Sequence, residues 1–310
     1  VFVDIGANHG VYAVEAATRC RKVVAVEPSA KTAGLLRASL ARNGCANATV
    51  HQVALGGADG TARLSTGASP ELAELTDGAG PGEEVSVRTL GAFEQDVGGM
   101  SFVKLDAEGS EEAILRAAAG LFRREAPVVM FELKHRAAVN TPLIETFRAI
   151  GFASYRLCFG LDLLVPFHPA EHTDPFLLNL FALTDDRAQE LERRGLLARS
   201  PVKQPPQADD DALRRWVAQR PLLAGLDRER ALEPTVAMRH LVAAHDRDLP
   251  GAARLAAALA ARRHAREAAS LGPEHALTLS RAHLDLGYPV AAREALAPLE
   301  RAPSQRPDAL

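Results

Sequence analysis

The chain opens on an apolar run that ends in an acid and two glycines. Asp4, Gly6 and Gly10 are spaced D-x-G-x-x-x-G and precede helix-forming residues 11–16. The pattern predicts a buried strand and a glycine-lined turn into a helix, where backbone can approach a bound molecule closely. A second apolar strand at residues 23–26 ends in Glu27, whose carboxylate can accept both hydroxyls of a ribose. Together these features predict half of a nucleoside-binding α/β sheet.

The glycine spacing indicates which nucleoside-containing cofactor the site would bind. A dinucleotide site requires G-x-G-x-x-G and a P-loop requires G-x-x-x-x-G-K-[ST], and the sequence has neither. S-adenosylmethionine carries no phosphate: its ammonium suits an acid at a strand end, and its carboxylate suits amides at a helix N-terminus. We therefore expect Asp4, Gly6, Asn8 and Gly10 to hold its methionine part and Glu27 its ribose. The alternative is structural, with an acid as helix cap and glycines as turn residues.

A second cluster, K-L-D-A-E-G-S-E, covers residues 104–111 and follows an apolar strand at 102–105. Ligands bind at the carboxyl ends of strands in open α/β sheets, so Asp106 and Glu108 should face the same crevice. His135 follows a strand expected at 128–133 and should flank it. For Glu111 the simpler interpretation is an acid favoured by the helix dipole. His135 is equally compatible with a loop histidine.

These blocks together resemble the FkbM family of S-adenosylmethionine-dependent methyltransferases. They are V-D-I-G-A-N-H-G at 3–10, V-E-P at 26–28, V-A-L at 53–55, F-V-K-L-D-A-E-G-S-E at 102–111 and F-E at 131–132. The resemblance covers about residues 1–184. It implies a class I methyltransferase fold and O-methylation of a hydroxyl on a sugar, a glycan or a secondary metabolite.

Methyl transfer to a hydroxyl requires alignment and usually a general base. Asp106 is the first choice for the base or substrate-orienting acid, with Glu108 and His135 behind it. An alternative is that Asp106, Glu108 and Glu132 hold Mg²⁺, which prefers oxygen ligands. The sequence lacks a dedicated ligand spacing, so no metal site is predicted.

The fold class expected is α/β: a Rossmann-like class I methyltransferase, with a mostly parallel sheet and helices on both faces, followed by an all-α C-terminal domain. Further expected elements are a strand at 49–55, a loop at 66–82, a helix at 111–121 and an antiparallel pair at 153–158 and 176–183. The domains predicted are residues 1–184 for cofactor binding, a Pro- and Asp-rich linker at 185–211, and a helical region at 212–310.

The helical region contains a loose repeat. Residues 244–254 echo residues 282–293 at a spacing of about 38 to 39 residues, near the period of a tetratricopeptide repeat. An ordinary Ala-rich bundle is the alternative. We expect this region to fold separately, to take no part in catalysis and to offer a surface to a protein partner.

Composition and charge argue against nucleic-acid-binding and membrane-spanning proteins. The 310 residues carry a net charge of −3, so no overall basic field favours nucleic acid. Three scattered cysteines suit a reducing cytosol, and no apolar stretch approaches the ~18 residues of a membrane span. The chain starts inside a strand without Met, so we expect an upstream segment. The rival functions are an NAD-linked oxidoreductase and an interaction protein with a vestigial methyltransferase domain.

Overall fold

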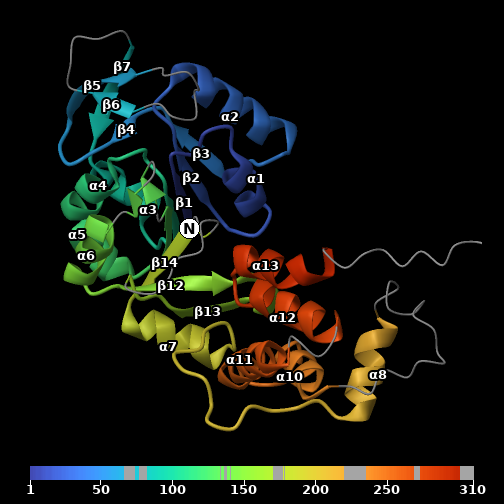
Figure 1. Ribbon diagram of the computed structural model, residues 1–310. Helices are drawn as coiled ribbons and strands as arrows, with labels where there is room; N and C mark the ends of the chain where they lie inside the picture. Colours follow the sequence, from blue (N-terminus) through green and yellow to red (C-terminus); the bar gives the residue numbers. More distant parts are fainter. Residues whose placement is uncertain are drawn as a thin grey trace, which may run out of the picture. The chain divides into compact units, whose positions relative to one another are not determined.

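The computed structural model (Figure 1) describes residues 1–65, 74–76, 82–132, 134–135, 138–139, 141–169, 177, 179–219, 235–268 and 273–300. The chain divides into two compact units. One comprises residues 1–155, 167–169 and 178–188, and the other 156–166, 170–177 and 189–310. The boundary falls inside a strand, β12 (Ala153–Cys158).

The first unit is built on a sheet with the strand order β12-β14-β9-β8-β1-β2-β3. Strands β1, β2, β3, β8 and β9 run parallel, and β14 lies antiparallel between β9 and β12. Their bounds are β1 Phe2–Ile5, β2 Val23–Val26, β3 Ala48–His51, β8 Phe102–Leu105, β9 Val128–Glu132 and β14 Asn179–Leu183. This is the mostly parallel sheet of class I methyltransferases, so the predicted fold is confirmed. The predicted antiparallel pairing near residues 153–183 is β12 with β14.

Side-chain alternation along the strands explains the layers. Phe2 and Ala25 share a buried cluster with Leu36, which lies on α2 (Ala30–Arg42), and α1 (Val11–Ala17) packs in the same cluster. Phe131 of β9 contacts Phe147 of α6 (Thr141–Ala149) with ring centroids 4.7 Å apart. Figure 1 shows α1 and α2 on one side of the sheet, and α6 with α4 (Glu111–Ala117) and α5 (Ala119–Glu125) on the other. Helices therefore cover both faces, as expected.

Two predicted elements are each divided. The strand expected at 49–55 breaks after β3, and β4 (Ala54–Leu55) joins a second sheet in the order β4-β7-β5-β6. The other strands of this sheet are β5 Gly60–Ser65, β6 Glu74–Thr76 and β7 Glu83–Arg88, with η2 (Leu90–Phe93) and α3 (Glu94–Val97) following. The helix expected at 111–121 is α4 and α5, separated at Ala118. Most of the predicted loop at 66–82 lies outside the described residues.

The second unit is mainly helical. Its elements include η3 (Phe159–Leu161), β13 (Leu163–Pro166), α8 (Asp210–Ala218), α10 (Val236–Ala244), α11 (Gly251–Glu267), α12 (Pro273–Asp285) and α13 (Pro289–Glu300). Helices α10 to α13 pack in chain order. Gly287 adopts the left-handed conformation, φ +83°, in the turn between α12 and α13. The tetratricopeptide-like character stays a prediction.

The core of the second unit includes residues from outside the predicted helical region. Leu161, Leu163 and Ala198 are fully buried in one cluster with Ala257 and Leu286. The segment predicted as a linker thus contains a core residue, Ala198, and all of α7 (Asp185–Arg193). Apolar burial inside a predicted linker means that the helices use residues before 212 to complete their core. Within the described residues, no helix is both long and apolar enough to span a bilayer.

Candidate functional site

A cavity of about 320 Å³ opens at the carboxyl ends of β1, β2 and β8. Five of the predicted site residues line it: Gly6, Asn8, Glu27, Asp106 and Glu108. Parallel strands bring their carboxyl ends to one edge, so residues up to 102 positions apart in sequence meet there. Asp106 and Glu108 therefore share one cavity with Gly6, Asn8 and Glu27, whereas Asp4 and Gly10 do not line it. His135 ends the short strand β10 (Lys134–His135), which pairs with β11 (Ala138–Val139), and its side chain lies outside the described residues.

Asp4 lies on β1, one residue before Ile5 of the cavity lining; it does not itself line the cavity and is 0% exposed. Within the described chain neither carboxylate oxygen has a partner at hydrogen-bond geometry, although the Ala13 backbone amide is near enough to lower the pKa of Asp4. Lys104 Nζ is 3.8 Å from Oδ1. Burial raises the pKa of Asp4 to about 6, although Lys104 opposes the shift. Buried carboxylates are normally hydrogen-bonded or ion-paired. Asp4 has only the long ion pair with Lys104, so its carboxylate keeps the capacity to bind a further cationic group.

Glu27 follows β2 and is held in a fixed orientation by two backbone amides. The Asn8 N–H donates to Oε2 and the Ser29 N–H donates to Oε1, each at 3.0 Å. Burial raises the pKa of Glu27, while these two amides lower it. Each oxygen keeps a second lone pair, so a fixed carboxylate can also accept two hydroxyl groups. The Asn8 side chain offers a further acceptor, because its Oδ1 is buried without a partner in the described chain.

The two glycines of the first turn are required by close packing. Gly6 has φ +74°, and a Cβ there would lie 1.8 Å from the carbonyl oxygen of Asp106. Gly10 has φ +90° and ends the turn as the residue before α1; a Cβ would lie 2.5 Å from Leu36 Cδ1. Gly10 does not line the cavity, so its role is to let the turn pack against α2. Gly6 lets the turn after β1 pack directly against the backbone of Asp106, which follows β8.

Gly6→Ala should therefore destabilise the protein by about 2 kcal/mol or more and abolish ligand binding at the cavity, since backbone must move to admit the methyl group. Thermal unfolding and calorimetric titration measure the two effects. Gly34→Ala is the matched control: Gly34 lies in α2 with open space around it, so it should stabilise the protein by about 0.5–1 kcal/mol. Equal behaviour of the two variants would contradict the packing argument.

Lys104 is the functional residue that the sequence analysis missed. It lies in β8, is 7% exposed and lines the cavity. Its Nζ donates to the Gly6 carbonyl at 3.2 Å and to Asp106 Oδ2 at 2.9 Å, and it lies 5.4 Å from the centre of the Tyr12 ring. A signal was present in the sequence, because a cation inside an apolar strand must be paired when the strand is buried.

The loop after β8 is shaped by Glu111. Its carboxylate accepts the N–H groups of Ala107 at 2.8 Å and of Gly109 at 3.0 and 3.2 Å. Glu108 adopts a left-handed conformation, φ +49°, beside the cavity. Glu111 is therefore a structural residue that holds this loop. Other cavity residues that the prediction did not name are Tyr12, Thr32 and Leu64.

The metal alternative gains no support from the geometry. Among the described residues, no three His, Cys, Asp or Glu side chains gather as a metal site. Asp106 is instead ion-paired with Lys104, and a bound cation would compete with that ammonium.

The fold and the site define a class I methyltransferase-type domain with a cavity at the switch point of its sheet. Residues 4–156 match the family described as the methyltransferase FkbM domain, and this part of the chain belongs to that family. The rival oxidoreductase interpretation is thereby left without support. Among curated proteins no match is found.

Comparison with solved structures finds methyltransferases of low similarity. The methyltransferase FkbM from Methylobacillus flagellatus KT is 20% identical, with 58% of this chain and 42% of that chain covered and a TM-score of 0.42. A precorrin-6y C5,15-methyltransferase from Geobacter metallireducens GS-15 is 12% identical, with coverage of 58% and 77% and a TM-score of 0.35. Magnesium protoporphyrin IX methyltransferase from Synechocystis PCC 6803, solved with bound SAM, is 10% identical, with coverage of 60% and 70% and a TM-score of 0.32. This chain spans less than half the length of the first relative, and likenesses at these values say nothing of its substrate.

Proposed function

We propose that the chain is an S-adenosylmethionine-dependent O-methyltransferase acting on a hydroxyl of a sugar, a glycan or a secondary metabolite. The observation that carries the proposal is Asp4, a fully buried carboxylate without a hydrogen-bond partner in the described chain, at the end of β1. The cofactor's methionine part carries an ammonium that would supply the missing partner. The NAD alternative offers no such cation at this end of the site.

The residues present fit the cofactor. Asp4 would hold the ammonium, and Glu27, oriented by its two backbone amides, would accept the ribose hydroxyls. Asn8 Oδ1 is a further buried acceptor. Bound there, S-adenosylmethionine supplies an activated methyl group on a sulfonium. The cavity's apolar residues, which include Val26, Val53, Leu55 and Leu64, would exclude water from the adenosine.

The acceptor hydroxyl must lose a proton as the methyl group transfers. Asp106 lines the cavity, and its side chain is 36% exposed, so it can reach an acceptor that enters from solvent. Lys104 fixes one of its carboxylate oxygens at 2.9 Å, which leaves the other for the hydroxyl. Glu108 and His135 stay as candidates for the same role. A cytoplasmic location, consistent with the free thiols of Cys20, Cys45 and Cys158, belongs to the same proposal.

Calorimetry with S-adenosylhomocysteine, S-adenosylmethionine and NAD tests the cofactor assignment. The proposal requires saturable binding of the first two and none of NAD. Transfer of labelled methyl groups to a panel of hydroxyl acceptors then tests the reaction. A protein that binds the cofactor and methylates nothing on the panel would favour the vestigial-domain alternative.

Glu27→Ala should weaken S-adenosylmethionine binding by about 1.5–3 kcal/mol, the range for hydrogen bonds to a charged group. The variant also frees the Asn8 and Ser29 amides, so circular dichroism and a melting curve must establish that it is folded. Glu15→Ala is the control, because Glu15 lies on α1 in an exposed pair with Arg19. A folded Glu27→Ala with unchanged affinity would overturn the ribose assignment.

A further inference from the structure

A groove in the second unit combines an apolar floor with an excess of positive charge. It lies between residues 201–205 and the last three turns of α11, with a volume of about 480 Å³. Ala256, Leu259 and Ala260 form its floor. Its charged lining consists of Lys203, Arg262, Arg263, Arg266 and Glu267. The chain as a whole is acidic, with a net charge of −3. The charge of the groove is therefore opposite in sign to the net charge of the chain.

The groove arginines differ from other arginines of the second unit in their partners. Ion pairs with carboxylates are made by Arg194, Arg199, Arg214, Arg239, Arg247 and Arg281. In the part of the chain that the structure describes, no carboxylate lies within ion-pair distance of Arg262, Arg263 or Arg266. The single acid of the groove, Glu267, faces His264 at 3.8 Å.

The positive charge of these arginines changes the pKa values of groups in and beside the groove. Burial lowers the pKa of Arg262; Tyr288 opposes this shift, and the Arg266 and Arg156 guanidiniums add to it. Burial also lowers the pKa of His283 to about 4, again with help from Arg262 and Arg266. Arg262 and Arg266 are four residues apart on one helix, a spacing at which like charges repel. A favourable helix dipole explains cations in the last turn, but it does not explain the desolvated Arg262.

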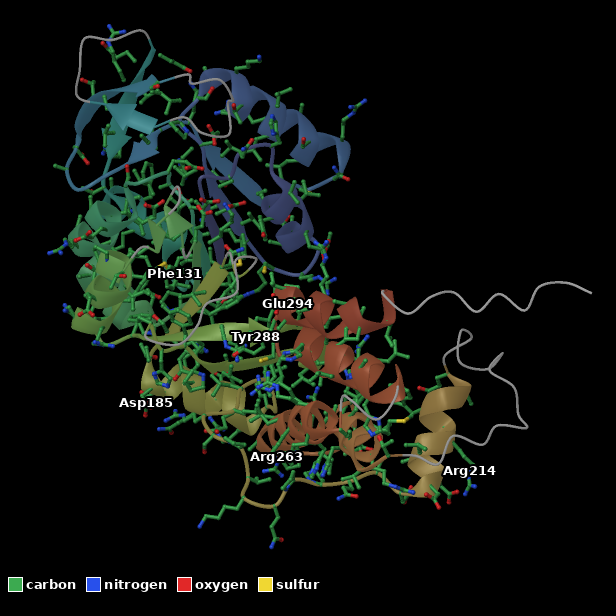
Figure 2. All side chains as sticks on the ribbon, in the orientation of Figure 1. Phe131, Asp185, Arg214, Arg263, Tyr288 and Glu294 are labelled. Carbon is green, nitrogen blue, oxygen red and sulfur yellow. The ribbon has the colours of Figure 1, made fainter. Side chains whose placement is uncertain are left out.

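The aromatic ring of Tyr288 contacts the Arg262 guanidinium. The Arg262 guanidinium lies 5.7 Å from the centre of the Tyr288 ring, and that of Arg156 lies 4.8 Å from it. Arg156 is further fixed by its hydrogen bond to the Tyr288 hydroxyl at 2.8 Å. Figure 2 labels Tyr288 and also Arg263. A guanidinium held on an aromatic ring is preorganised for a planar carboxylate partner.

We infer that this groove binds an acidic peptide segment of a partner protein, with apolar side chains on the floor and carboxylates on the arginines. The wall formed by residues 256–267 is about 16 Å long at 1.5 Å per residue, which matches about five residues of extended peptide. An inorganic anion or a polyphosphate would leave the apolar floor uncovered. The inference concerns the second unit and does not depend on the methyltransferase assignment.

Fluorescence anisotropy with the full chain and a labelled peptide of alternating Glu and Leu, about five residues long, tests the inference. We expect saturable binding that weakens with salt, and none by a Lys–Leu peptide. Arg263→Glu with Arg266→Glu should weaken binding by ~10-fold or more, about 1.4 kcal/mol. Arg293→Glu, an exposed arginine of α13 outside the groove, should change it by less than about 2-fold.

Glu267→Gln separates a charge effect from a folding effect. It removes the one acid of the groove, so it should tighten peptide binding by roughly 2-fold or more, which a damaged fold would not do. Absence of peptide binding would overturn the inference. Equal or tighter binding of inorganic phosphate or an oligothymidylate would overturn it as well, since the floor would then play no part.

Discussion

Replacing Asp4 by Asn should stabilise the protein without ligand and weaken its binding of S-adenosylmethionine. Asp4 is fully buried, and burial raises its pKa from the ordinary 3.8 to about 6. The ionised form is thus disfavoured in the folded state by about 3 kcal/mol at neutral pH, at 1.36 kcal/mol per pKa unit. Asn removes the buried charge at nearly constant shape. We expect a gain in unfolding free energy of up to about 3 kcal/mol.

The raised pKa of Asp4 also determines how the free energy of unfolding changes with pH. Between pH 3.8 and about 6 the folded protein holds the Asp4 proton more tightly than the unfolded chain does. Stability linked to Asp4 is therefore present at low pH and is lost as the pH rises through about 6. Denaturant unfolding of the wild type and of Asp4→Asn across this window should show the wild-type slope and its absence in the variant.

Cofactor affinity should change with pH in the opposite direction to stability. An ammonium needs the ionised Asp4, so wild-type affinity should fall as the pH drops below about 6, up to tenfold per pH unit while the cofactor keeps its charge. Asp4→Asn should bind weakly at every pH and show a flat profile. Asp96→Asn is the control: Asp96 is a surface acid whose pKa is lowered by Lys22, so it should leave the cofactor profile unchanged. A destabilised Asp4→Asn with intact affinity would contradict the assignment.

Local sequence patterns were sufficient for the sheet and for most of the site. Each buried strand of the first unit is a short apolar run, and the acids that follow β2 and β8 meet because parallel strands end at one edge. Gly6 and Asn8 were found for the same reason. What the pattern could not supply is the partner of each acid. Lys104 belongs to the centre of the site, but only the register of β1 with β8, which sets Asp4 opposite Lys104, reveals the pairing.

Tertiary packing also decides what local composition leaves open in the second unit. Proline and aspartate predicted a linker at 185–211, whereas Leu197 and Ala198 are fully buried because the helices need apolar residues from that segment. Along the sequence of this unit, arginines are interspersed with acids. In the structure the acids pair with some arginines and leave Arg262, Arg263 and Arg266 together in the groove. Sequence spacing gives the charge balance of a helix but not the distribution of its charges among neighbours.

The second large effect is expected at Asp106. Asp106→Asn keeps the shape of the side chain and removes its basicity, so turnover should fall by ~10²-fold or more, the scale of lost general-base assistance. Cofactor affinity should stay nearly intact, because Asp4 and Glu27 carry those contacts in our proposal. Single-turnover methyl transfer at saturating cofactor, with affinity from calorimetry, separates the two quantities. A collapse of affinity with normal turnover at saturation would show that Asp4 and Asp106 have each other's roles.

Lys104 should influence both carboxylates, and this distinguishes its role from simple packing. Its Nζ holds Asp106 Oδ2 at 2.9 Å and lies 3.8 Å from Asp4 Oδ1, where its charge lowers the pKa of Asp4. Lys104→Met should therefore lower turnover by misaligning Asp106, and it should also move the pH midpoint of cofactor binding upward because Asp4 loses a counter-charge. Lys104→Arg keeps the charge and should restore the midpoint even where turnover stays low. An unshifted midpoint in a folded Lys104→Met would mean that Lys104 only fills space, since a packing residue has no means of changing the proton affinity of Asp4.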